Sequence, residues 1–104
     1  MAVNKIEDTI WQIKALRNDL DDFCGLLESE MDTIQDRLMQ ISKAGWCQEW
    51  VEQYQRNCSG LLEEEMNQII YQIRTMHLEY INLFLERVLT YWNEIGESEV
   101  SSIN

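Results

Sequence analysis

The first 41 residues of the chain contain a seven-residue repeat of apolar side chains. This alternation of three and four residues is typical of the a and d positions of a helix that packs lengthwise against another helix. We therefore predict one long helix over about residues 4–42. One series occupies every seventh position, and the second lies between its members, interrupted only by Arg17: Ile6, Ile13, Leu20, Leu27, Ile34, Ile41; Val3, Ile10, Cys24, Met31, Leu38.

A second repeat of the same kind occupies the other half of the chain. Gly45, in a segment where the first repeat stops, predicts a turn at about residues 43–46. We expect a second helix over about 47–95, weakest at 57–60, because Gly60 costs a helix interior about 1 kcal/mol. We expect the tail, 96–104, to be disordered. The second repeat consists of Leu62, Ile69, Met76 and Leu83, beside Val51, Cys58, Met66, Ile73 and Tyr80.

The two repeats can be paired in an antiparallel hairpin, in which facing residue numbers have a constant sum. Leu27 with Leu62 and Leu20 with Ile69 both sum to 89, and the implied midpoint lies beside Gly45. The prediction is an all-α fold, with one long antiparallel two-helix hairpin over residues 3–95. Two helices alone bury little surface, so we expect a partner to complete a four-helix bundle.

A further apolar row on the second helix lies beside the expected seam and is the predicted contact surface. It includes Ile70, Ile81, Phe84, Val88 and Tyr91. We expect it to face outward, joined by Trp11, Leu16, Phe23 and Leu26 from the first helix. Trp46 and Trp50, one helical turn apart, could form a recognition knob at the hairpin tip or seal the turn. The predicted partner-binding residues are Trp46, Trp50, Tyr54, Ile70, Ile81, Phe84, Val88 and Tyr91.

The charge of the chain argues against two classes of partner. With 19 acidic and 8 basic residues the formal charge is −11, which repels phosphate backbones and anionic membrane surfaces. The N-terminus has no signal-peptide pattern, and no run of 18 apolar residues occurs. We expect no nucleic-acid binding and no membrane insertion. We also expect a chain made in the cytosol, which would leave the cell only by a route without a cleaved signal.

No catalytic, cofactor or metal site is expected. The run Glu63–Glu65 resembles half of a paired-carboxylate magnesium site, but the second acidic pair is missing, since no aspartate follows Asp36. Arg74 stands where a di-iron motif would need a glutamate before His77. The three cysteines lack metal-ligand spacing. We therefore predict a protein that is not an enzyme, with His77 a packed, hydrogen-bonded histidine in preference to an interfacial pH switch.

A hairpin of about one hundred residues with a tryptophan just after the turn resembles the WXG family of small type VII secretion proteins. The resemblance covers residues 3–95 and is carried by Trp46 and by Tyr54, an aromatic residue eight positions later. Two departures accompany it. Gln48 replaces the glycine of the Trp-x-Gly turn. In the export signal Tyr-x-x-x-Asp/Glu, Glu94 comes one position early after Tyr91.

The resemblance implies a divergent family member that dimerises, or that accompanies a larger secreted effector such as an LXG toxin as its targeting partner. A generic intracellular coiled-coil adaptor or homodimeric scaffold is the alternative. The sequence leaves open whether the partner is a larger helical effector, a second small hairpin or a second copy.

Overall fold

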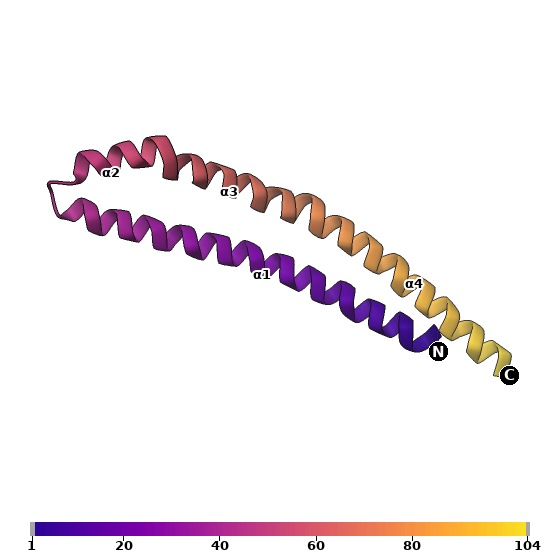
Figure 1. The fold of residues 1–104 in the computed structure, drawn as a ribbon. Coiled ribbons are helices and arrows are strands. Elements are labelled where there is room, and N and C mark those ends of the chain that lie inside the picture. Colours follow the sequence, from indigo (N-terminus) through magenta and orange to yellow (C-terminus); the bar gives the residue numbers. More distant parts are fainter. Residues whose placement is uncertain (1, 104) are drawn as a thin grey trace. The chain divides into compact units, whose positions relative to one another are not determined.

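The computed structural model describes the backbone of residues 2–103 and the side chains of residues 5–95. Helix α1 (Ala2–Lys43) is followed by a second arm made of α2 (Gln48–Tyr54), η1 (Gln55–Ser59), α3 (Gly60–Gln72), η2 (Ile73–His77) and α4 (Leu78–Ile103). No strand occurs in residues 2–103. The predicted all-α helical hairpin is therefore confirmed (Figure 1). The four-helix bundle with a partner stays a prediction.

The contacts within the chain define two compact units. The turn unit comprises Asp22–Ile73, and the terminal unit comprises Met1–Asp21 and Arg74–Asn104. In each unit, a segment of α1 lies antiparallel to a segment of the second arm (Figure 1). Helix α1 contributes to both units, and so does η2.

The predicted seam of α1 is confirmed by the burial of its side chains. Ile13, Cys24, Met31 and Leu38 are buried, and Cys24 is fully so. The remaining described seam residues up to Ile34 are half-buried. Arg17 holds an a position among them, and its Nη1 donates a hydrogen bond of 3.3 Å to Oδ1 of Asn82 in the terminal unit. The polar interruption in the repeat is thus paired across the hairpin instead of being left in an apolar seam.

The predicted seam of the second arm is only partly right. Val51, Met66 and Ile73 are buried as predicted, but Cys58, Tyr80 and the whole series that was paired with α1 by the constant sum of 89 are exposed. Leu62, Ile69, Met76 and Leu83 are 47%, 46%, 63% and 54% exposed. The buried and half-buried residues of the arm form two series that face α1, and only Val51, Met66 and Ile73 among them belong to the predicted seam: Val51, Ser59, Met66, Ile73, Ile81, Val88, Ile95; and Glu63, Ile70, Leu78, Leu85, Trp92.

Two π-helical turns explain the change of face. The first series advances by seven residues, except for steps of eight from Val51 to Ser59 and from Ile73 to Ile81. These two steps contain η1 and η2, the π-helical turns of the arm. A π turn bonds residues five apart and so takes in one extra residue. After each insertion, the residues that face α1 therefore lie one position later in the sequence than an uninterrupted heptad would place them.

The turn between the arms is built on Gly45. Its φ is +85°, in the left-handed region, and its N–H donates to the carbonyl of Ser42 at 3.1 Å. The N–H of Ala44 donates likewise to Ile41 at 3.1 Å, so two carbonyls at the end of α1 are satisfied. Such a glycine is the common way to end an α-helix, because it has no Cβ to oppose a positive φ.

We expect Gly45→Ala to lower the free energy of unfolding by about 1 kcal/mol, the cost of a left-handed backbone for a residue with a Cβ. Open space surrounds the position that a Cβ on Gly45 would take, so steric overlap adds nothing. Urea denaturation of both chains provides the measurement. Gly45→Asn should cost less, because asparagine tolerates this conformation better. An equal cost for both would argue against a backbone origin.

Helix α4 continues to Ile103, beyond the predicted end at Ile95 and through the segment expected to be disordered. The chain contains no proline, and so nothing in this segment removes a helical N–H or clashes with the preceding turn. The side chains of residues 96–104 lie outside the described ones.

Candidate partner-binding surface

Among the described side chains that precede the a positions of the seam, Thr9, Glu30, Arg37 and His77 are polar and exposed, and the other six are apolar and half-exposed. They are Leu16 and Phe23 on α1, Leu62 and Ile69 on α3, and Phe84 and Tyr91 on α4, with exposed fractions of 51%, 45%, 47%, 46%, 50% and 57%. These are the g positions of the heptad, which lie beside the seam.

The g positions of both helices of an antiparallel pair lie along the same side of the pair, because the opposite chain directions mirror one helix onto the other. The terminal unit therefore has one apolar flank, formed by Leu16, Phe84 and Tyr91. The turn unit has its own apolar flank, formed by Phe23, Leu62 and Ile69. Each of these residues keeps roughly half of its surface available to a partner.

The opposite side of the turn unit is polar. In that unit the e positions of α1 and α3 include Glu28, Gln35 and Asn67. Nε2 of Gln35 donates a hydrogen bond of 2.9 Å to Oε2 of Glu63, and so joins the two arms there. The turn unit thus has one side closed by polar contacts and one side on which three apolar side chains, Phe23, Leu62 and Ile69, lie beside the charged Glu30 and Arg37. A partner that needs apolar surface would use the second.

The structure divides the predicted partner-binding residues into two groups. Trp46, Trp50, Phe84 and Tyr91 are exposed, and Tyr54 is 36% exposed. Ile70 is 6% exposed, and Ile81 and Val88 are half-buried at seam positions. The expected outward orientation of these three is therefore wrong, because the π turns bring them to face α1. Leu62 and Ile69 were assigned to the seam from the sequence, and they belong to the surface.

An aromatic group lies just after the turn. Trp50 and Tyr54 stack with ring centroids 5.3 Å apart and planes inclined by 8°. Trp46 is 88% exposed, and so its ring covers very little of the hairpin. This exposure favours the recognition knob over the structural seal as the role of Trp46, since a sealing side chain would be buried.

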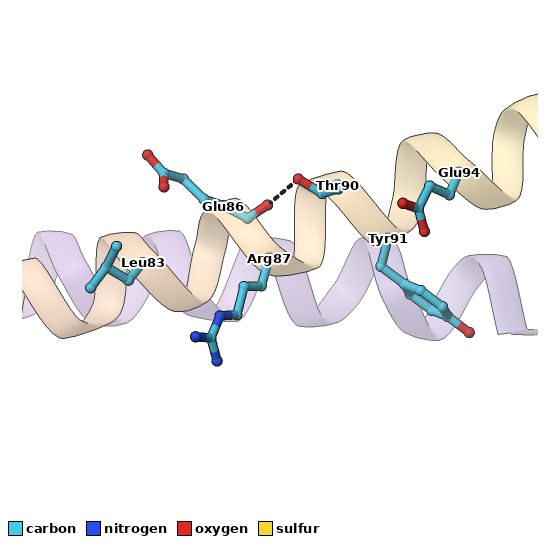
Figure 2. A pocket seen from close by; sticks show the side chains of 6 residues that line it. All are labelled: Leu83, Glu86, Arg87, Thr90, Tyr91 and Glu94. Carbon is cyan, nitrogen blue, oxygen red and sulfur yellow. Dashed lines mark hydrogen bonds between the residues drawn. The ribbon is translucent and has the colours of Figure 1, made fainter.

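The outer face of α4 has a shallow depression of about 350 Å³ (Figure 2). Figure 2 shows Arg87 and Tyr91 on one side of the helix and Glu86 on the other. Tyr91 and Glu94, the pair that approximates the export motif, both line this depression. A docking helix would therefore meet an aromatic ring flanked by charges of both signs. The lining residues are Leu83, Glu86, Arg87, Thr90, Tyr91 and Glu94.

A second depression, of about 320 Å³, lies on the terminal unit beside η2. It is lined by Met76, His77, Tyr80 and Ile81. His77 is exposed, so the expectation of a packed histidine is wrong. The extra residue of the π turn explains this position, because it turns Leu78, instead of His77, toward the seam.

Within the described part of the chain, no group of three or more histidine, cysteine or acidic side chains is arranged to hold a metal ion. No helix among the described residues combines the length and the apolar character needed to cross a membrane. Comparison with family models, curated proteins and solved structures finds no match to this chain.

Proposed function

We propose that this chain is a non-enzymatic helix-binding module whose apolar flanks dock on the helices of a partner protein. The observation that carries the proposal is the set of six g-position side chains, each about half exposed, on one side of each antiparallel pair. Covering the exposed half of such a side chain contributes about 1 kcal/mol, so several together support a stable complex.

The charge of the chain favours a different protein over a second copy. A formal charge of −11 doubles when two copies associate, and the resulting repulsion opposes a homodimer. A partner with an apolar helical face and basic residues at its rim would match this chain in both respects. A homodimeric scaffold remains the alternative function, to be decided by the experiment below.

The more specific form of the proposal is a WXG-like type VII secretion partner, which binds the helical N-terminal region of a larger effector such as an LXG toxin. The helical hairpin, the exposed Trp46 just after its turn, and the exposure of Tyr91 and Glu94 on α4 support it. Export of the chain with its effector, by a route without a cleaved signal, belongs to the same proposal.

Affinity capture with the intact chain, followed by reconstitution from purified components, tests this function. We expect a larger exported protein with a helical N-terminal region, which forms a stoichiometric complex with the chain in analytical ultracentrifugation. A symmetric dimer that excludes other proteins would support the homodimeric scaffold instead. A chain that stays monomeric and reconstitutes with no captured protein would overturn the helix-binding proposal.

Trp46→Ala should leave the helical circular-dichroism signal and the melting temperature nearly unchanged, because this side chain is 88% exposed and seals nothing. The same substitution should weaken binding of the reconstituted partner by about tenfold, as expected for an aromatic anchor at an interface. Trp50→Ala, which also removes a stacking partner of Tyr54, is a useful comparison. A large loss of helicity in Trp46→Ala would restore the sealing role.

A further inference from the structure

A small hollow lies between the two arms of the turn unit, beside the π turn η1. Its volume is about 110 Å³, and both partners of the Gln35–Glu63 hydrogen bond belong to its lining. One water molecule accounts for about 30 Å³ of liquid volume, so the hollow is large enough for a longer side chain of another molecule. Single π turns inside α-helices are frequent at functional sites.

One part of the lining is apolar. Met31 and Leu38, two a-position residues of α1, line the hollow and are 6% and 5% exposed. Gly60 also lines it and has no side chain that could fill it. A Cβ on Gly60 would lie 2.7 Å from the carbonyl oxygen of Gln55, a backbone atom, so a larger residue there meets steric conflict. The glycine at the end of the π turn thus keeps space open beside the apolar part of the lining.

The polar part of the lining includes a hydroxyl group without a partner among the described residues. Ser59 is 7% exposed, and its side chain forms no hydrogen bond within residues 5–95. No fully buried polar side-chain atom in that range lacks a partner, so the Ser59 oxygen retains some accessible surface. Ser59 lines the hollow, and this surface therefore opens into it. Because hydroxyl groups in the interior are normally hydrogen-bonded, Ser59 indicates a polar group supplied by another molecule.

The charged residues around the hollow are all acidic. Glu63 is half-buried, and Gln35 donates to one of its two carboxylate oxygens, Oε2. A second hollow, of about 250 Å³, shares Gln35 and Glu63 with the first and is lined in addition by Glu28 and Asp32. Among the described residues, no lysine or arginine lines either hollow. The electrostatic potential of this lining favours a cationic ligand.

We propose that the hollow beside the π turn binds the side chain of a lysine from another protein. The aliphatic stem of the lysine would cover Met31 and Leu38, as such stems commonly cover apolar surface. Its ammonium group has three N–H donors, which suit acceptors on Glu63, Ser59 and Gln55. A guanidinium group fits this set less well, because its planar fork matches a single carboxylate. The site lies apart from the apolar flanks, so it goes beyond the helix-binding function.

The probe for the intact chain is n-butylammonium, which corresponds to the side chain of lysine alone. An NMR titration should give saturable shifts of the backbone amide signals, centred on Ser59 and Gly60. The neutral analogue n-butanol has a similar shape and should bind about tenfold more weakly, because it lacks the charge. N-acetyl-lysine amide carries the lysine backbone and should bind about as well as n-butylammonium. This last comparison distinguishes a site for a lysine of a protein from a site for free amines only.

Glu63→Gln removes the negative charge and keeps an acceptor for Gln35. This substitution should weaken the binding of n-butylammonium about tenfold, since hydrogen bonds to charged groups are the strong ones. Ser59→Ala removes one neutral acceptor and should weaken binding about fivefold. The matched control is Glu64→Gln, which removes the same charge from the adjacent exposed residue and should leave the affinity unchanged. Circular dichroism of each variant checks that the hairpin remains folded.

Equal effects of Glu63→Gln and Glu64→Gln would overturn the site, because they would mean that the cation is attracted only by the overall charge. Equal affinity for n-butanol, or no binding of N-acetyl-lysine amide, would overturn it as well. If Glu63→Gln does not fold, Ser59→Ala decides, and an unchanged affinity in that variant contradicts the proposal. These titrations use the chain and small probes alone, so their failure leaves the helix-binding function untouched.

Discussion

Ile70→Asp should unfold the turn unit, whereas Ile69→Asp should leave it folded. Ile70 is 6% exposed at a seam position, while Ile69 is 46% exposed on the apolar flank. A carboxylate without a partner in the seam costs several kcal/mol, which is comparable with the whole stability of a small domain. On the flank the same carboxylate stays in water. Thermal melts followed by circular dichroism should show the difference directly.

This pair of variants is closely matched, since the two residues are identical in type and adjacent in the chain. It also distinguishes the structure from the uninterrupted heptad, which reverses the two positions and therefore the two results. If Ile69→Asp unfolded the protein and Ile70→Asp did not, the π turn at Gln55–Ser59 would be absent in solution. The free energies of unfolding from urea titrations would give the size of the effect.

The sequence was sufficient to predict α1, because one uninterrupted pattern determines its inward face. Ile13, Cys24, Met31 and Leu38 lie where a strict seven-residue repeat places them. The turn was also predictable, since Gly45 stands where this repeat ends. Both predictions rest on a local sequence pattern that is compatible with only one placement of its residues, inward in the seam or at the turn.

The second arm could not be predicted in the same way, because its sequence contains two repeats that compete. Leu62 and Ile69 continue a strict heptad, and the correct inward row, with Glu63 and Ile70, needs an extra residue before it. A π turn has no strong signature in composition, since it differs from an α turn mainly in its hydrogen bonds. A useful signal existed in the step of eight residues from Ile73 to Ile81, followed by steps of seven to Val88 and Ile95.

The candidate surface was only partly predictable for the same reason. Phe84 and Tyr91 were expected to be outward, and the structure exposes them, because they differ in position from both inward rows. Ile81 and Val88 were placed with them although they face α1. The surface was defined relative to the seam, so every error in the predicted seam is also an error in the predicted surface. One missed insertion exchanges buried and exposed residues in the part of the arm that follows it.

The double substitution Phe84→Asp with Tyr91→Asp should abolish binding of the partner while the hairpin remains folded. The two side chains are 50% and 57% exposed, so little of the hairpin's stability depends on them. Aromatic residues at the centre of an interface commonly contribute about 2 kcal/mol or more each, which corresponds to about thirtyfold in affinity for each one. The two introduced carboxylates would add a desolvation cost in the complex.

Val88 should be left unchanged in this experiment, because its side chain faces α1 and an aspartate there would damage the hairpin itself. A suitable control is Asn67→Asp with Asn93→Asp, which adds the same two charges at exposed positions away from the apolar flanks. Sedimentation velocity of each variant with the purified partner should show free components for the first pair and an intact complex for the control. Equal assembly in both would mean that the partner binds another face, and the aromatic group at Trp46 and Trp50 would then be the next surface to change.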